Sequence, residues 1–175
     1  MYLISAYFDE KTNMILQRYM DQITEKTGNG FMKEHKVPPH MTISSIEARN
    51  IEVLIPAFKN LEGKLLPGEI QFVSIGQLLP YVFYVTPVLN EYLLNLSKQV
   101  FDCFFDIPET SISRYYQPLS WQPHVTLGKT LTKEQMRTAF SAMQESFAPF
   151  TAMVTEIGLA KVHPHEDVER YELGE

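Results

Sequence analysis

Hydrophobic and polar positions alternate along the chain with two periods, and their order predicts a mixed chain of strands and helices. Tyr2 to Phe8 is a short apolar run typical of a strand. Residues 11–27 carry apolar side chains three or four positions apart, which indicates an amphipathic helix that ends at Gly28. The further elements expected in this half are a strand, a helix and a strand at residues 40–46, 51–61 and 70–79.

The second half repeats this order. Residues 81–85 favour a strand, and Thr86 followed by Pro87 fits a helix N-cap and first helical position, so a helix is expected from there to about residue 105. Thr132 to Gln135 forms a capping box that opens another helix. Strands at residues 124–127 and 151–162, and a closing hairpin strand at 168–173, complete the expected elements.

Short landmarks align between the two halves. Pro39-His40-Met41-Thr42 matches Pro123-His124-Val125-Thr126, and Ile75-Gly76 matches Ile157-Gly158. The chain of 175 residues is long enough for one domain or two tightly joined lobes, and no long linker divides it. We therefore expect a single unit, residues 1–175, with lobe-forming repeats at about 1–80 and 81–175 that face each other across a cleft.

The two motifs each place polar side chains on one face of a strand. Because side chains alternate along a strand, His40, Thr42 and Ser44 share a face while Met41 points into a core. In the second motif His124 and Thr126 share a face in the same way. If a twofold axis relates the lobes, the two His-Thr rows meet across one substrate.

This pairing suits the hydrolysis of a phosphodiester. The reaction needs one group to take a proton from water and another to give a proton to the leaving oxygen, and imidazole can do either near neutral pH. The threonine hydroxyls can donate hydrogen bonds to phosphate oxygens. The scheme requires no metal and no other cofactor. The alternative interpretation is that both histidines are structural.

The motifs Pro-His-Met-Thr-Ile-Ser and Pro-His-Val-Thr-Leu-Gly-Lys resemble the signature of the two-histidine (2H) phosphoesterase superfamily, which includes the 2′-5′ RNA ligase-like proteins. The resemblance implies an α+β fold, duplicated and bilobal, with antiparallel sheets lining a central cleft and helices outside. It implies hydrolysis of 2′,3′-cyclic phosphates on RNA ends or small nucleotides, sometimes with reversible 2′-5′ ligation. The first motif lacks the Phe-Leu-Gly run that is common in the RNA ligase-like subgroup.

The resemblance also implies roles for particular residues. His40 and His124 would be the acid and base, with His40 protonating the leaving oxygen, and Thr42 and Thr126 would bind phosphate. Lys129 stands where relatives often have a basic residue, so it is a candidate phosphate contact or a solvated strand-end lysine. Ser44 is a candidate extra phosphate donor or an ordinary strand residue.

The loop before the second motif carries further candidates for substrate binding. Tyr116 and Trp121 could stack on a base, and Arg114 could neutralise a phosphate. The alternative is a loop held by aromatic packing. Lys33, His35 and Lys36 precede the first motif and form either a local positive rim or a solvated loop.

One remaining cluster and one single residue with reactive side chains have simpler interpretations. His163-Pro164-His165-Glu166-Asp167 could bind a metal, but its position between two expected strands favours a turn. Cys103 is the only cysteine and is expected to be buried.

Charge and hydropathy limit the function classes further. The net charge of −6 argues against an extended nucleic-acid track, although not against a small nucleotide or one RNA end. With no recognisable signal peptide or apolar span, we expect a monomeric cytoplasmic protein whose partners are nucleotides or RNA ends rather than membranes. A non-catalytic nucleotide or RNA binder, and a 2′-5′ RNA ligase, are the alternative functions.

Overall fold

Strands and helices alternate along the computed structural model, which describes residues 1–162 and 165–174. The strands are β1 (Tyr2–Phe8), β2 (Met41–Ala48), β3 (Gly68–Leu78), β4 (Val82–Pro87), β5 (Thr110–Ile112), β6 (Val125–Gly128), β7 (Phe150–Lys161) and β8 (Glu166–Glu172). The α-helices are α1 (Glu10–Thr27), α2 (Phe31–Glu34), α3 (Ile55–Lys59), α4 (Glu91–Phe104) and α5 (Lys133–Ser146). Two 3₁₀ turns, η1 (Ile51–Val53) and η2 (Arg114–Tyr116), complete the described elements.

Local signals in the sequence set several helix ends; those at Gly28 and Thr132 are the predicted ones, whereas the cap at Asp9 is not. The side chain of Asp9 accepts a hydrogen bond from the Thr12 amide and begins α1. Gly28 ends it in the left-handed conformation at φ 71°, which a residue without Cβ adopts at little cost. At α5 both halves of the capping box predicted at Thr132 and Gln135 are present.

Two predicted helices differ from the structure. Thr86 and Pro87 do not cap a helix, because they finish β4, where Pro87 pairs with Phe72 and the Thr86 hydroxyl donates to the carbonyl of Pro123 at 2.8 Å. The helix begins instead at Glu91, after Asn90 caps the amide of Leu93. The helix expected over residues 51–61 is split into η1 and α3, with proline in the first turn of α3.

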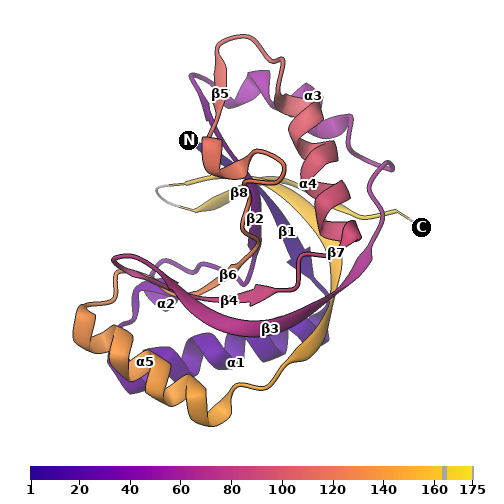
Figure 1. The fold of residues 1–175 in the computed structure, drawn as a ribbon. Coiled ribbons are helices and arrows are strands. Elements are labelled where there is room, and N and C mark those ends of the chain that lie inside the picture. The colour runs from indigo at the N-terminus through magenta and orange to yellow at the C-terminus, as the bar shows by residue number, and fades with distance from the viewer. Residues whose placement is uncertain (163–164, 175) are drawn as a thin grey trace.

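All the described strand pairings are antiparallel, and they run in a closed circuit. The order β1-β2-β6-β4-β3-β7 returns to its start because β7 pairs with both β3 and β1. β7 does this along its length: Phe150 to Val154 pair with β3, and Val154 to Lys161 pair with β1. The long curved β7 therefore connects the upper and lower parts of the molecule in Figure 1.

The two halves of the chain exchange elements between the lobes. α1 packs against α5 and β6 of the second half, whereas α4 packs against α3 and β2 of the first half. β1 pairs with β2 and β7, and β7 pairs with β8. β4, in contrast, pairs with β3 and β6. A division at about residue 80 thus follows the sequence repeat, but each lobe in Figure 1 contains segments from both sides of that division.

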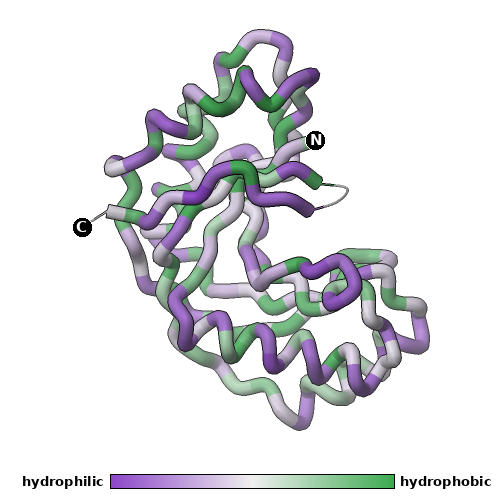
Figure 2. The backbone as a smooth tube through the Cα atoms, turned by 180° about the vertical axis from the view of Figure 1, so that it is seen from behind, coloured by the Kyte–Doolittle hydropathy of each residue, from purple (hydrophilic) through white to green (hydrophobic). Residues whose placement is uncertain are grey.

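The core is continuous between the helices and strands. Hydrophobic residues from β1, β2, β4, β6 and the inner faces of α1, α4 and α5 form one buried cluster. Figure 2 shows hydrophilic and hydrophobic positions alternating along the helices, as expected for helices with one buried side. Cys103 is half-buried rather than fully buried, and its thiol lies 3.0 Å from the carbonyl of Ala57. Among the helices of the described chain, none combines the length and apolar character that a membrane crossing requires.

Candidate active site

The two histidine motifs lie on neighbouring strands. Met41 pairs with Val125 in the antiparallel contact between β2 and β6, and both side chains are fully buried. Continued by one residue in each direction, this register sets His40 opposite Thr126 and Thr42 opposite His124. Because opposite residues share a face, the four side chains lie together on the face away from the core. All four are partly exposed.

Each histidine is fixed by a backbone carbonyl two residues earlier in the chain. Nδ1 of His40 lies 2.8 Å from the carbonyl of Pro38, and Nδ1 of His124 lies 2.8 Å from the carbonyl of Gln122. A carbonyl oxygen can only accept, so this contact requires the proton on Nδ1. In the neutral ring Nε2 then carries a lone pair and is the nitrogen available to a ligand.

A tyrosine lies beside each histidine. The ring centroids of Tyr7 and His40 are 6.3 Å apart, and those of Tyr84 and His124 are 5.3 Å apart. Tyr7 is on β1 and Tyr84 on β4, the first strand of each half. The Tyr84 hydroxyl accepts a hydrogen bond from the side chain of Gln122, whose carbonyl holds His124.

The landmark glycines of the repeat provide space for these tyrosines. A Cβ at Gly158 would lie 2.7 Å from Cε2 of Tyr7, and a Cβ at Gly76 would lie 2.6 Å from the hydroxyl of Tyr84. Both distances are shorter than a non-bonded contact allows. The matched glycines therefore support the two histidines through the tyrosines.

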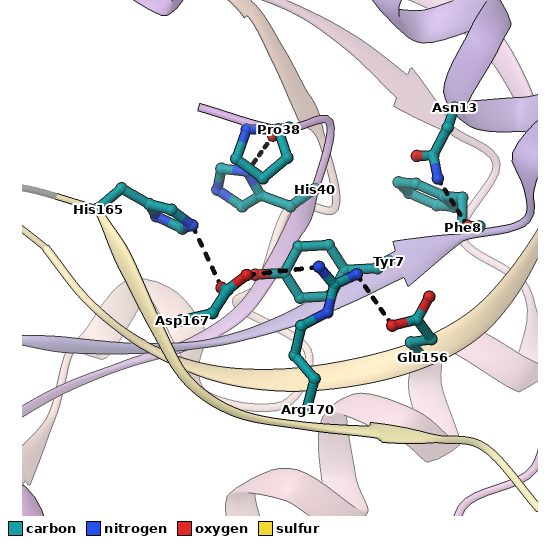
Figure 3. A network of polar contacts seen from close by, with 9 residues as sticks. All are labelled: Tyr7, Phe8, Asn13, Pro38, His40, Glu156, His165, Asp167 and Arg170. Carbon is teal, nitrogen blue, oxygen red and sulfur yellow. Dashed lines mark hydrogen bonds and ion pairs between the residues drawn. The ribbon is translucent and has the colours of Figure 1, made fainter. Parts of the chain in front are cut away.

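The surroundings of the two histidines differ, because β8 adds charged groups on the His40 side (Figure 3). The Tyr7 hydroxyl donates to Asp167 at 2.7 Å. The guanidinium of Arg170 lies 3.6 Å from the centroid of the Tyr7 ring and forms an ion pair with Glu156 at 3.0 Å. The ring of His165 stacks on that of His40, with centroids 5.4 Å apart.

Burial lowers the pKa of both histidines. The pKa of His40 falls to about 4, and the neighbouring His165 and His124 act in the same direction, while the Pro38 carbonyl and Asp167 oppose them. Burial also lowers the pKa of His124. Both rings are thus neutral at pH 7 before a ligand binds. A bound phosphate anion would favour the protonated form of either ring.

Two of the further residues predicted for substrate binding are buried, and a third is half-buried. Trp121 is 6% exposed, and its indole N–H donates to the carbonyl of Thr42 at 2.9 Å, so it supports the first motif strand from the second half of the chain. Ser44 is 2% exposed, on β2. Tyr116 packs against the core, and burial raises its pKa.

The predicted basic residues are on the surface. The guanidinium of Arg114 donates to the hydroxyl of the adjacent Tyr115 at 2.8 Å. Nζ of Lys129 lies 5.6 Å from the ring centroid of Phe31 in α2. The rim residues Lys33, His35 and Lys36 are exposed in and just after α2, where the His35 ring stacks on that same Phe31.

A groove of about 1010 Å³ runs beside α1 and reaches Pro39, but neither motif histidine lines it. Its acidic residues outnumber its one basic residue, Arg18; they are Asp9, Glu10, Asp21, Glu25 and Glu156. A phosphate would be repelled there. Size alone therefore does not identify the phosphate site, whereas the histidine face has the appropriate chemistry.

The residues that surround the motifs carry no strong signal in the sequence. The pattern marks Tyr7 and Tyr84 as strand residues, although each lies on the strand that opens its half. The turn expected at residues 163–167 contains His165 and Asp167, which lie near the start of β8 beside His40. His163 and Pro164 lie outside the described residues. Within the described chain, no group of three or more His, Cys, Asp or Glu side chains is arranged to hold a metal ion.

The chain is similar to known proteins in sequence and in fold. Residues 16–166 match the sequence model of the 2′-5′ RNA ligase superfamily. No curated protein matches the chain. Among solved structures, TT0787 of Thermus thermophilus is similar over 99% of this chain and 98% of its own, with a TM-score of 0.64 and 16% identity. A phosphoesterase crystal structure gives a TM-score of 0.60 at 14% identity with the same two coverages.

A further similar structure is E. coli LigT complexed with 3′-AMP, with a TM-score of 0.56, 15% identity, and coverage of 99% of this chain and 98% of its own. At these identities the structures establish the fold alone. They confirm the α+β class with antiparallel strands that the motifs predicted.

Proposed function

The chain belongs to the 2′-5′ RNA ligase superfamily of two-histidine phosphoesterases, and from this premise we propose that it hydrolyses 2′,3′-cyclic phosphates on RNA ends or small nucleotides by acid–base catalysis without a metal. The proposal depends on one observation: His40 and His124 are fixed by the same kind of hydrogen bond and so carry the proton on the same ring nitrogen. Each donates a hydrogen bond from Nδ1–H to a backbone carbonyl two residues before it and leaves Nε2 for the substrate.

The proposed reaction uses the two imidazoles in opposite protonation states. One neutral Nε2 takes a proton from water as the water oxygen attacks phosphorus. The other ring, protonated once the phosphate anion is bound, gives its proton to the departing ribose oxygen, and the P–O bond of the ring breaks. Each well-placed acid or base contributes roughly 10²–10⁴ in rate. By the family resemblance, His40 is the acid and His124 the base.

Thr42 and Thr126 have the role of phosphate ligands in this proposal. The register sets each threonine opposite the histidine of the other motif. Their hydroxyls are not hydrogen-bonded to other side chains or backbone groups within residues 1–162 and 165–174, so they are free to donate to the non-bridging oxygens. Donors held in place where charge develops stabilise the transition state.

The nucleotide part of the substrate is proposed from chemistry and from relatives. E. coli LigT, which shares the fold, has been crystallised with 3′-AMP, a nucleotide with a phosphate on the ribose. Arg114, Tyr116 and Lys129 remain candidates for contacts beyond the phosphate. The proposal includes a monomeric protein acting in the cytoplasm.

The test is a substrate panel with matched variants. The panel contains the four 2′,3′-cyclic mononucleotides, short RNAs with a cyclic end, and 2′-5′-linked oligonucleotides. Wild type should turn over at least one cyclic phosphate in the presence of EDTA, whereas His40→Ala and His124→Ala should lose about 10²-fold or more in kcat. Arg137→Ala is the control, since this residue is exposed on α5 and pairs with Glu134 of the same helix.

Three results would contradict the proposal. EDTA inhibition with metal rescue would replace the acid–base scheme by metal catalysis. Binding of nucleotides without turnover of any compound would make the protein a binding module. Formation of 2′-5′-linked RNA from cyclic and 5′-hydroxyl ends would instead identify ligation, in which the same two histidines transfer the protons.

A further inference from the structure

A third histidine lies at the candidate active site. His165 comes from the β7–β8 hairpin, far along the chain from both motifs, yet its ring centroid is 5.4 Å from that of His40 and the rings are 30° from parallel. Its side chain is only 11% exposed, so the ring is not a freely moving surface group. On the other side of the site, the ring beside His124 is that of Tyr84.

A chain of polar contacts leads from His165 back to β1. Its Nε2 lies 3.4 Å from Oδ1 of Asp167. Asp167 accepts from the Tyr7 hydroxyl at 2.7 Å and lies 3.4 Å from the guanidinium of Arg170. Arg170 is fixed in turn by Glu156 on β7. Figure 3 shows these side chains meeting on one side of His40.

We propose that His165 is a positioning residue for His40: its ring, oriented by Asp167, stacks on the His40 imidazole and holds it at the angle that directs Nε2 to the substrate. This inference deepens the proposed function and depends on it for its catalytic meaning. The Pro38 hydrogen bond fixes one point of the His40 ring, but rotation about that contact is still possible. The stack removes this remaining freedom.

The charges around His40 give the proposal a second consequence. The titratable and charged groups around His40 come from several elements: Tyr7 on β1, His124 before β6, Glu156 on β7, and His165, Asp167 and Arg170 at or just before β8. Of these, His165 lowers the pKa of His40 and Asp167 raises it. Loss of the His165 imidazole removes its charge contribution and should therefore raise the pKa of His40, more in a variant that also reduces the burial of the ring than in one that keeps it.

Two variants distinguish the effect of ring stacking by His165 from the effect of its charge. His165→Phe keeps an aromatic ring but cannot be protonated, and His165→Ala removes both. We expect His165→Ala to lower kcat about tenfold or more through misplacement of His40, with KM changed little. His165→Phe should keep kcat within about threefold of wild type. Arg137→Ala, at an exposed position on α5, should change neither constant.

NMR titration of the His40 ring provides a readout that needs no substrate. The resonance is assigned by its absence in His40→Gln, and its apparent pKa should rise in both His165→Ala and His165→Phe. An unchanged His40 titration in both variants would overturn the inference, as would a His165→Phe enzyme as slow as His165→Ala. If wild type turns over nothing, the proposed function fails, while the titration still decides whether His165 acts on His40.

Discussion

Met41 pairs with Val125, and this contact joins the two repeats at the residue that follows each histidine. The two side chains point into the core and are fully buried, so the residues on either side of them face outward. One backbone pairing therefore gathers two histidines and two threonines from positions 84 residues apart in the sequence onto a single face. Each part of this arrangement can be tested separately.

The first prediction concerns stability and pH. The pKa of His40 lies at about 4 in the folded chain, against 6.5 for an ordinary histidine, so the unfolded state binds protons more readily. The free energy of unfolding should be highest above pH 6.5 and fall as the pH drops from 6.5 towards 4. His124, whose pKa is also lowered, adds to the same slope.

Urea unfolding at several pH values checks this. In His40→Asn the slope between pH 6.5 and 4 should be shallower than in wild type, while Gln99→Ala, an exposed change that removes no titratable group, should keep the wild-type slope. Asp167 adds to the slope only near pH 4 and does so in wild type and variants alike, because the neighbouring His165 and the hydrogen bond from Tyr7 lower its pKa to about 2 in the folded chain and the unfolded state binds its proton first. If the free energy of unfolding fell equally steeply with pH in wild type and His40→Asn, the folded chain would not lower the pKa of His40.

The second prediction concerns the threonine hydroxyls. Thr42→Val and Thr126→Val keep the shape of the side chain and remove the donor. Each should lower kcat by about 10²-fold, the usual effect of losing one donor to developing charge. Thr151→Val, at an exposed position on β7, is the matched control. Steady-state kinetics on the best cyclic phosphate measures the effect, and unchanged kcat in both motif variants would exclude the threonines as phosphate ligands.

The third prediction concerns the glycines that accommodate the tyrosines. Gly76→Ala and Gly158→Ala force a methyl group against Tyr84 and Tyr7, and each should destabilise the fold by about 1–3 kcal/mol. Gly174→Ala is the control, because its Cβ would meet nothing closer than 3.8 Å. Denaturant unfolding gives the values. Variants at Gly76 and Gly158 as stable as the control would mean that the tyrosines can move aside freely.

The fourth prediction distinguishes two roles for Trp121. Because its N–H donates to the carbonyl of Thr42, Trp121→Phe should reduce stability by about 1–3 kcal/mol while leaving KM nearly unchanged. A residue that stacks on the nucleotide base would show the opposite pattern, with KM raised and stability kept. Tyr115→Phe, on the same loop but 64% exposed, should affect stability little.

The sequence repeat predicted the candidate site better than it predicted the helices near it. His40, Thr42, His124 and Thr126 share a strand face because alternation along a strand is a local property of the backbone. The predicted start of the helix at Thr86 is wrong because this residue, a good N-cap by sequence, is bonded to Pro123 across the sheet. A tertiary contact outweighed a local preference that amounts to about 1 kcal/mol.

The sequence alone determined the duplicated order of elements, the C-terminal end of α1, the start of α5 and the two motif faces, because each depends on residues close together in the chain. Only the tertiary structure decided that α1 and α4 cross to the opposite lobe, that Gly76 and Gly158 make room for tyrosines, and that His165 lies on His40. These relationships join residues that are distant in the sequence. They depend on which strands pair, and strand pairing is set by the whole core rather than by any local pattern.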